Sequence, residues 1–394
     1  MKRLFHGLRP NVLWLGFASF FTDFASEMVF PLMPHFLTTV LGASKATLGL
    51  IEGAADSLAA LLRIFSGWAS DRAGKRKPFI FWGYFLSSAM RPLYAIVTAP
   101  WHVFVIRMAD RLGKGTRLAA RDALIADSCD SEARGRAYGL QNAMDQFGAA
   151  VGPLVAGAML ASGMSFRSVF LWTAVPAAFV MMFIGFLVRE VPSRAEAKPL
   201  SLSLRPFSGN FRWFLATVAV FTLANSSDAF LVQRMPEVGI PLGWATVAWS
   251  GFSVLKGMVA LAGGAIADRF DRRRVVLAGW LIYAAVYCGF AFASKPAPFL
   301  LCLAAYTLFN ALATSVQRAV VADLVPPELK GTAFGLFYFA VGITALPASF
   351  LFGALSESFS PKTAFLTEAA IALVACAMLL AVRKPVRAVN PARP

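Results

Sequence analysis

Ionisable residues lie inside long apolar stretches of this 394-residue chain, where a charge is costly. Asp23 and Glu27 are four residues apart within the apolar run 12–40. If that run is a helix, both carboxylates project from one face of it. Two carboxylates on one face repel each other when both are charged, and a bound proton relieves that repulsion. The spacing predicts a proton-exchanging pair; the alternative is that each carboxylate pairs with a neighbouring cation.

A second charged segment, at 101–125, supplies such cations. Its charged residues recur at helical spacing and would form one polar face: Arg107, Asp110, Arg111 and Lys114. We expect the three cations to balance the carboxylates or to bind an anionic group, and Asp110 to exchange protons. Asp145, in the run 136–162, is a further candidate for proton exchange.

Other polar residues in the apolar runs are also candidates. Three candidates for substrate contact lie in the second half of the chain: Asn225, Asp228 and Arg318. For Asn225 and Asp228 the alternative is hydrogen bonding between helices. Glu52 and Asp56 repeat the four-residue spacing near the start of their apolar run. They could be functional acids inside the membrane or could simply face water. We expect four more residues to be solvated or to reach toward the membrane surface: Arg91, Arg117, Arg121 and Asp122. For Arg91 the alternative is that it is the partner of an opposite charge.

The elements that must position these residues are long and apolar. The chain is 58% hydrophobic and only 15% charged, with a mean hydropathy of +0.64, which excludes an ordinary soluble composition. A helix needs about 20 residues to cross roughly 30 Å of hydrocarbon. We predict an all-α integral membrane protein whose 12 transmembrane helices cover 12–40, 46–70, 78–98, 101–125, 136–162, 168–189, 211–234, 243–267, 275–294, 298–323, 332–356 and 362–383.

The basic residues are concentrated between these runs. The formal net charge is +16, yet Lys and Arg form no soluble basic domain, so we expect no nucleic-acid partner. They collect in alternate connections, which is the positive-inside pattern of a multi-pass membrane protein. Both termini are therefore predicted to be cytoplasmic, in the cytoplasmic (inner) membrane of a bacterium.

The two halves of the chain resemble each other. Two landmarks recur 196 residues apart: Ala126-Asp127 as Ala322-Asp323, and Gly135-x-Ala137-x-Gly139 as Gly331-x-Ala333-x-Gly335. Internal repeats of this kind are typical of transporters. The predicted division is a six-helix bundle over 1–189, a cytoplasmic linker over 190–210, and a second six-helix bundle with a short tail over 211–394. A pseudo-two-fold axis would relate the two bundles.

Two motifs carry a resemblance to a known family. A basic turn reads Gly67-Trp-Ala-Ser-Asp71-Arg72-Ala-Gly74-Lys75-Arg76, with a reduced copy at Asp268-Arg269. A second segment reads Gly148-Ala-Ala-Val-Gly152-Pro153-Leu-Val-Ala-Gly157. The turn resembles the loop between helices two and three of the major facilitator superfamily, where it implies gating, and the second segment resembles that family's antiporter motif. Without the resemblance, the first would be only a topology signal and the second only a tight helix crossing.

The resemblance implies a secondary transporter that moves a small organic solute by alternating access, coupled to protons, with export by antiport favoured. The alternatives are symport of a polar nutrient or of a metal chelate such as a siderophore, lipid flipping and, in another class, a receptor or scaffold without transport. The sequence has no complete phosphate-loop motif and no H-E-x-x-H, so we expect no enzyme, metal site or cofactor. The expected energy source is the proton gradient. The expected partners are the solute, protons and membrane lipids, and the expected state is a monomer.

Overall fold

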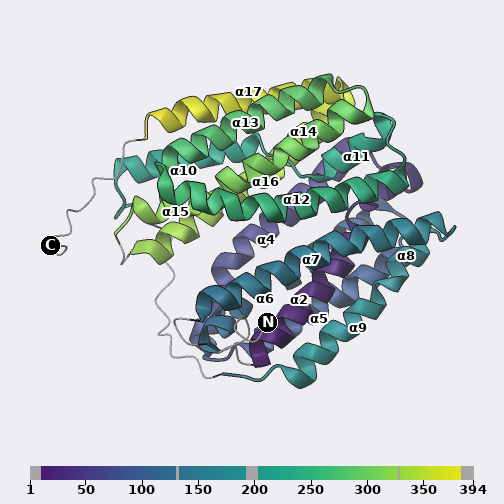
Figure 1. The fold of residues 1–394 in the computed structure, drawn as a ribbon, viewed down its shortest axis with the longest axis horizontal. Coiled ribbons are helices and arrows are strands. Elements are labelled where there is room, and N and C mark those ends of the chain that lie inside the picture. Colours follow the sequence, from purple (N-terminus) through teal and green to yellow (C-terminus); the bar gives the residue numbers. More distant parts are fainter. Residues whose placement is uncertain (1–9, 130–132, 192–202, 327–328, 383–394) are drawn as a thin grey trace.

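The computed structural model describes residues 10–129, 133–191, 203–326 and 329–382, without the side chains of residues 67, 68, 71, 261–268 and 315. The secondary-structure elements in these ranges are all helices, and Figure 1 shows most of them running roughly side by side. Seven helical segments in the described ranges are long and apolar enough to cross a membrane. The predicted all-α class is confirmed.

The first half of the described chain crosses the molecule six times. Its crossings are α2 (Pro10–Val29) continued by α3 (Met33–His35) and the π-helical η1 (Phe36–Val40); α4 (Lys45–Ala73); α5 (Lys77–Met90) continued by the 3₁₀ turn η2 (Arg91–Ile96); α6 (Pro100–Asp127); α7 (Arg134–Ala161); and α8 (Phe166–Trp172), α9 (Ala174–Met182) and η3 (Phe183–Leu187). The first crossing is interrupted after Val29, where Pro31 cannot donate a backbone hydrogen bond.

The second half also crosses six times within the described residues. Its crossings are α10 (Gly209–Leu223) with α11 (Ala229–Glu237); α12 (Leu242–Arg269); α13 (Arg272–Phe292); α14 (Pro296–Phe309), η4 (Asn310–Thr314) and α15 (Ser315–Asp323); α16 (Lys330–Ser358); and α17 (Pro361–Leu380). The ends of all twelve predicted runs fall within three residues of these bounds. The prediction of twelve helices is therefore confirmed.

The seventh crossing differs from the prediction, because it is not one continuous helix. The residues between α10 and α11 leave the helical path, and side chains of other helices bond their backbone groups. Tyr283 of α13 donates to the carbonyl of Ala224, and Ser349 of α16 accepts the N–H of Ser227 at 3.0 Å. The crossing also continues past the predicted end of the run 211–234, because α11 extends to Glu237.

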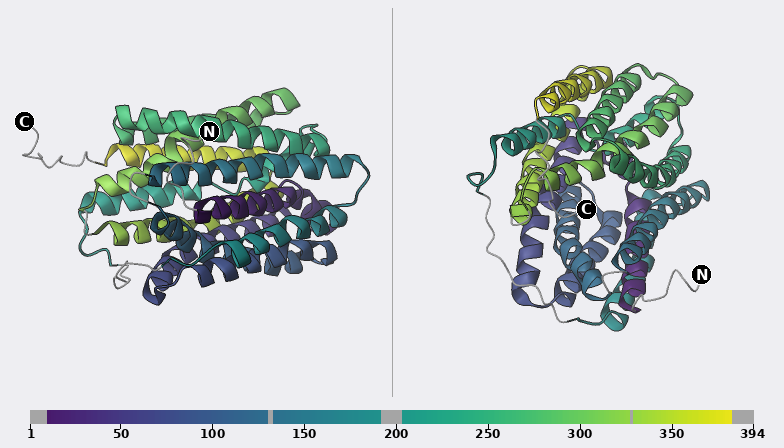
Figure 2. Two further views of the ribbon diagram at one scale, coloured as in Figure 1. Left: turned by 60° about the horizontal axis from the view of Figure 1, so that its bottom comes forward. Right: turned by 60° about the vertical axis from the view of Figure 1, so that its left-hand side comes forward.

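The helices form two bundles that follow the two halves of the sequence (Figures 1 and 2). Between the bundles, α4 packs against α16 and α7 packs against α12. Within the first bundle α2 packs on α7 and α5 on α6, and within the second α13 packs on α17. The end of η3 and the beginning of α10 lie at one end of the molecule, at the left in Figure 1, which we call the linker end. The opposite end is called the far end.

One ion pair occurs twice at matching positions of the two halves. Arg76 Nε lies 3.6 Å from an oxygen of Asp127, and Arg272 Nη1 lies 2.8 Å from an oxygen of Asp323. Both partners of the second pair are 196 residues beyond those of the first. Each pair joins the beginning of one helix to the end of the next crossing, at the linker end. The internal repeat seen in the sequence thus corresponds to a repeated contact in the fold.

Candidate functional site

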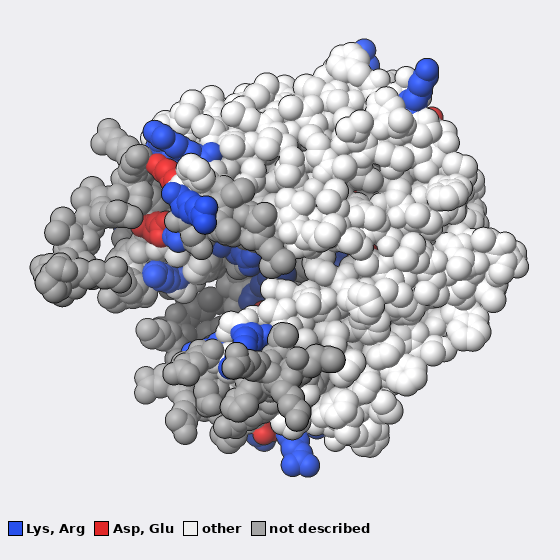
Figure 3. Space-filling model, in the orientation of Figure 1, with Lys and Arg blue, Asp and Glu red and all other residues white. Residues whose placement is uncertain are grey.

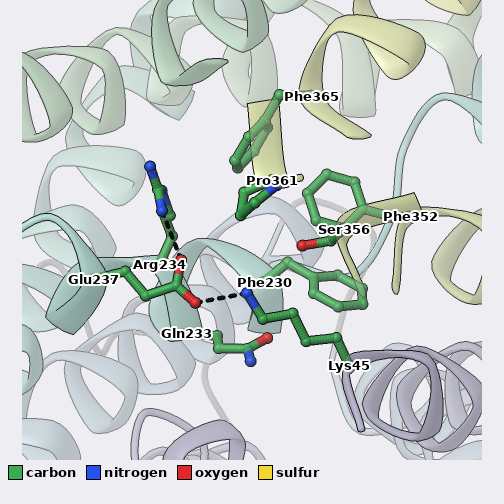
Figure 4. Close-up of a pocket in the computed structure, with 9 residues that line it drawn as sticks. All are labelled: Lys45, Phe230, Gln233, Arg234, Glu237, Phe352, Ser356, Pro361 and Phe365. Carbon is green, nitrogen blue, oxygen red and sulfur yellow. Dashed lines mark hydrogen bonds and ion pairs between the residues drawn. The ribbon is translucent and has the colours of Figure 1, made fainter. Parts of the chain in front are cut away.

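The two bundles are in contact at the far end. Lys45, at the start of α4, forms an ion pair of 2.7 Å with Glu237, at the end of α11. Arg234 donates to the same carboxylate at 2.6 Å, and Figure 4 shows the three charged groups meeting. The backbone N–H of Ala46 also donates to Glu357 of α16 at 3.0 Å. We call Lys45, Arg234 and Glu237 the far-end latch, since they join the bundles there.

At the linker end the surface between the bundles is hollowed. Figure 3 shows an indentation there, with Lys and Arg side chains around it and in its depth. Deeper in the interface the hydroxyl of Ser57 donates to the carbonyl of Gly342, which joins α4 to α16. The arrangement is a pair of bundles closed at the far end and open toward the linker end.

The two acids of α2 lie beside this interface. The Glu27 carboxylate accepts a hydrogen bond of 3.0 Å from the indole N–H of Trp249, which belongs to α12 of the second bundle. Asp23 lies one turn nearer the linker end, on the same continuous helix. Both side chains are half-buried, and within the described part of the chain Asp23 has neither an ion pair nor a hydrogen bond. Glu27 therefore bonds across the interface, whereas Asp23 is left with an unused carboxylate.

Two buried ion pairs join α6 to its neighbours. Arg107 Nη2 lies 2.6 Å from Glu52 of α4, and Arg91 Nη2 lies 3.1 Å from Asp110; all four residues are at most 4% exposed. Arg91 also donates to the carbonyl of Thr22 at 2.9 Å. The expectation that Arg91 reaches toward the membrane surface is therefore wrong. Glu52 does not face water either, since it is the buried partner of Arg107.

The expectation that the later arginines of α6 are solvated is also wrong. Arg117 is 2% exposed and donates to Ser87 of α5 at 2.8 Å. Arg121 is 8% exposed and lies 3.5 Å from Asp145 of α7 and 2.9 Å from Asp122. Asp122 keeps half of its side chain exposed, as expected. The polar face of α6 is longer than predicted because α5 and α7 provide partners for it.

In the first bundle, four charged side chains near the interface are at least half-buried and are without ion pairs or hydrogen bonds in the described structure: Asp23, Asp56, Arg111 and Lys114. Arg111 is only 9% exposed, and its Nε has no partner. Asp56 interacts electrostatically with Arg111, and Lys114 with Asp23, but neither pair is close enough to form an ion pair. We call these four residues the unpaired cluster. It offers both positive and negative groups to a polar solute.

The second bundle contributes fewer polar groups. Asp228, at the break before α11, accepts a hydrogen bond of 2.9 Å from Tyr306. Asn225 is half-buried in the same break, whereas Arg318 is exposed on α15. The structure thus brings Asp228 to a hydrogen-bonded interior position and leaves Arg318 at the surface.

Glu368 is a buried acid that the sequence reasoning missed. It is 2% exposed on α17 and accepts hydrogen bonds from the backbone N–H of Ser226 at 3.0 Å and from its hydroxyl at 3.1 Å. Its signal was an acidic residue inside the apolar run 362–383. The partner could not be inferred, because it lies 142 residues away in the broken seventh crossing.

The glycines of the second motif lie where α7 meets α2. A Cβ at Gly148 would collide with the carbonyl of Phe20, and a Cβ at Gly152 would collide with that of Phe24. Pro153 is buried inside the same helix. Gly157 faces Thr246 of α12 equally closely, so it lies between the bundles. Small residues at these positions allow two close helix contacts.

Replacing Gly152 by alanine should destabilise the protein, because the new methyl group would meet backbone atoms that cannot move alone. The matched control is Gly139→Ala, on the exposed side of the same helix, where nothing lies within 4 Å of the new Cβ. That control should be neutral or stabilising by up to about 1 kcal/mol, since alanine favours helix. Thermal unfolding in detergent compares the two variants, and equal midpoints would contradict the packing argument.

The basic turn lies wholly on the first bundle. Gly74 has a φ of +62°, a conformation that favours glycine, and lets the chain reverse between α4 and α5. Arg76 is 3% exposed and donates to Ser70 at 2.8 Å, in addition to its pair with Asp127. Exposed residues of the two turns are Arg72, Lys75 and Arg269, while the burial of Gly67 and the side chains of Asp71 and Asp268 lie outside the described part. Gating by these turns stays a prediction.

The fold and the site together define a class of protein. Twelve helical crossings in two bundles, which meet around unpaired charged side chains, are the architecture of a helical membrane carrier. The family model of the Major Facilitator Superfamily matches residues 15–249 and 237–394. The chain belongs to the major facilitator superfamily.

Individual relatives match all or part of the chain. It is 31% identical over 385 residues to an uncharacterized MFS-type transporter of Methanocaldococcus jannaschii, with 95% of each chain covered. It is 24% identical over 172 residues to the proton-coupled antiporter flippase LtaA of Staphylococcus saprophyticus, covering 42% of each. Its fold is similar to the crystal structure of a mutant of the nucleoside transporter NupG, with a TM-score of 0.81, 14% identity, and coverage of 95% of this chain and 100% of that one.

Proposed function

We propose that the chain is a proton-coupled secondary transporter of a small organic solute, working by alternating access, with export by antiport favoured. The observation that carries the proposal is the position of Glu27. Its carboxylate belongs to the first bundle and is bonded to Trp249 of the second. Because the bond crosses the interface that must open and close, a change of charge on Glu27 changes the relative stability of the two states.

The proton acts through the strength of this bond. A charged carboxylate accepts a stronger hydrogen bond than a neutral one, so an ionised Glu27 holds Trp249 and the bundles together. Protonation weakens the bond and allows α12 to separate from α2. Asp23, one turn nearer the open end, has no bonded partner among the described residues and can relay the proton. Asp110 and Asp145 are each held by an arginine, so we assign proton exchange first to the two acids of α2.

Two observations support the direction of transport. The glycines of α7 resemble the antiporter motif, with Ala156-Gly157 in place of its final double glycine, and one relative is named as a proton-coupled antiporter. The same relative is named as a flippase, which keeps lipid movement as an alternative. Import of a polar nutrient or a chelate by symport is a further alternative, because the unpaired cluster suits a polar solute. A receptor or scaffold would not need a carboxylate bonded across the interface.

The orientation in the membrane follows from charge. Basic residues gather at the linker end, so by the positive-inside rule that end would face the cytoplasm, with both termini. The open hollow would then face inward. We propose a bacterial cytoplasmic membrane as the location and a monomer as the working unit. No cofactor is required, since the proton gradient supplies the energy.

Transport can be tested in proteoliposomes that contain a trapped pH dye. A panel of metabolites, chelates and drugs is added outside, one at a time. Antiport predicts that solute entry drives protons out and raises the internal pH, whereas symport predicts a fall. Movement of a labelled lipid without any proton signal would favour flipping. Folded protein that moves protons with none of the solutes would contradict the proposal.

The far-end latch should control which side is open. Lys45→Glu removes the pair with Glu237 and places a new carboxylate beside Glu237 and Glu357. A partly exposed pair is worth up to about 1 kcal/mol, so the far-end-open state should gain about fivefold in population. The measurement is the labelling rate of Ser356→Cys, beside the latch, with an impermeant maleimide in a background without the native cysteines.

Charge reversal provides the control for the latch. Glu237→Lys alone should also speed labelling, and combining it with Lys45→Glu should restore a slow rate, because the pair is rebuilt with its charges exchanged. Lys362→Glu changes the same charge elsewhere at the far end and should have little effect. A double variant as fast as the single ones would contradict a direct pair.

A further inference from the structure

Arg111 differs from the other buried arginines of the first bundle. The others each have an acidic or hydroxyl partner: Arg76 with Asp127, Arg91 with Asp110, Arg107 with Glu52, Arg117 with Ser87, and Arg121 with Asp145. Arg111 is equally deep, at 9% exposed, yet none of its donors is bonded in the described structure. A guanidinium group removed from water without a partner costs several kcal/mol. Such a residue is suited to a partner that arrives from outside.

The neighbouring helix α4 does not supply that partner. Along α4 and α6 two acid–base couples lie one turn apart. Glu52 and Arg107 form an ion pair of 2.6 Å, whereas Asp56 and Arg111 interact electrostatically without forming an ion pair. Lys114, one turn further along α6, is half-buried and likewise has no bonded partner within the described part of the chain. Arg111 and Lys114, on one face of α6, thus remain available to a ligand. They lie next to the ion pair between Glu52 and Arg107.

The charges that face this pair come from three other helices. Asp23 and Glu27 approach Lys114 from α2, and Asp56 approaches Arg111 from α4. Lys256, on α12, interacts electrostatically with Glu27 and adds a cation from the second bundle. The surroundings therefore contain acids as well as bases, and an anion can be held only directly between Arg111 and Lys114.

We propose that Arg111 and Lys114 bind an anionic group of the transported solute, such as a carboxylate, sulfonate or phosphate. The guanidinium fork of Arg111 matches the paired oxygens of such a group, and Lys114 adds a second charge. The physiological meaning of the site rests on the proposed transport function. The binding itself does not, because it can be measured without a proton gradient.

The position of the site also fixes the sign of coupling. A bound anion is repelled by ionised Asp23 and Glu27, so protonation of α2 and anion binding favour each other. A solute whose only charge is anionic would therefore travel with protons. Antiport, the direction favoured above, requires that the solute also carries a cationic group that competes with protons at α2. A transported antiport substrate should accordingly be zwitterionic.

Inorganic sulfate provides a defined probe for the anion site. The thermal unfolding of the purified chain in detergent is followed as sodium sulfate replaces sodium chloride at constant ionic strength. We expect a saturable rise of the midpoint by at least about 2 °C, since a ligand that binds the native state stabilises it. Arg111→Gln and Lys114→Gln should each abolish the saturable rise. Arg212→Gln, an exposed change of the same charge, should retain it.

Folding of the variants is monitored separately. Arg111→Lys keeps the charge and should weaken but not abolish the response, and without sulfate Arg111→Gln should unfold no earlier than the unchanged chain. Absence of a saturable rise, or its persistence in both glutamine variants, would overturn the proposal. Displacement of sulfate by a short-chain phosphatidylglycerol would identify the anionic group as a lipid headgroup, and lack of displacement as that of a soluble anion. A failure of proton coupling would leave these results unchanged.

Discussion

Replacing Glu27 by glutamine should reduce solute-driven proton movement by about 10- to 100-fold, the equivalent of the roughly 1.5–3 kcal/mol that a hydrogen bond to a charged group contributes. Glutamine keeps the size of the side chain and can still accept a bond from Trp249, but it cannot bind or release a proton. The interface should therefore lose its response to protons without losing its packing. The measurement is the dye signal in proteoliposomes, with any solute that moves protons through the unchanged chain.

The variant Trp249→Phe distinguishes the role of the Glu27 carboxylate from that of its hydrogen bond with Trp249. This variant keeps the carboxylate of Glu27 and most of the aromatic packing but removes the donor across the interface. Solute should still drive proton movement. Its rate should change, because loss of the bond alters the populations of the states open at the linker end and at the far end. An unchanged proton signal in Glu27→Gln would contradict the assignment of this residue and direct attention to Asp23 and Asp145.

The helices could be predicted from the sequence because each has a local cause. An apolar run of about 20 residues must bury its backbone bonds in a helix when it lies in lipid, and basic residues or prolines mark where it ends. Pro100 and Pro296 begin helices at the predicted places. The repeat of Asp127 as Asp323 was also visible, and the fold converts it into a repeated ion pair.

The partners of the charged residues could not be predicted, because they depend on which helices lie side by side. Glu52 looks like a water-facing acid in the sequence, and only the packing of α4 on α6 makes it the partner of Arg107. Trp249 is one of nine tryptophans and has no local feature that connects it to Glu27, which is 222 residues away. The break before α11 was hidden for the same reason, since distant side chains satisfy its backbone.

Breaking the buried pair of Glu52 and Arg107 should have the largest effect on stability among the changes considered. Arg107→Gln leaves Glu52, which is 2% exposed, without a counter-charge, and Glu52→Gln does the same to Arg107. Loss of one partner of such a pair costs about 3–5 kcal/mol. Each single variant should lower the midpoint of thermal unfolding by several degrees, in contrast to Arg111→Gln, which removes an unpaired charge.

The double variant Glu52→Leu with Arg107→Met decides between stability and function as the reason for the pair. Two apolar side chains of similar volume leave no buried charge, and such replacements are often neutral or stabilising. The double variant should therefore recover most of the stability lost in the single ones. If it is also active, the pair is only structural. If it is stable but inactive, the charges of Glu52 and Arg107 are needed for function. They would then keep Asp56 and Arg111, one turn away, from forming an ion pair, which leaves Arg111 available to the anion.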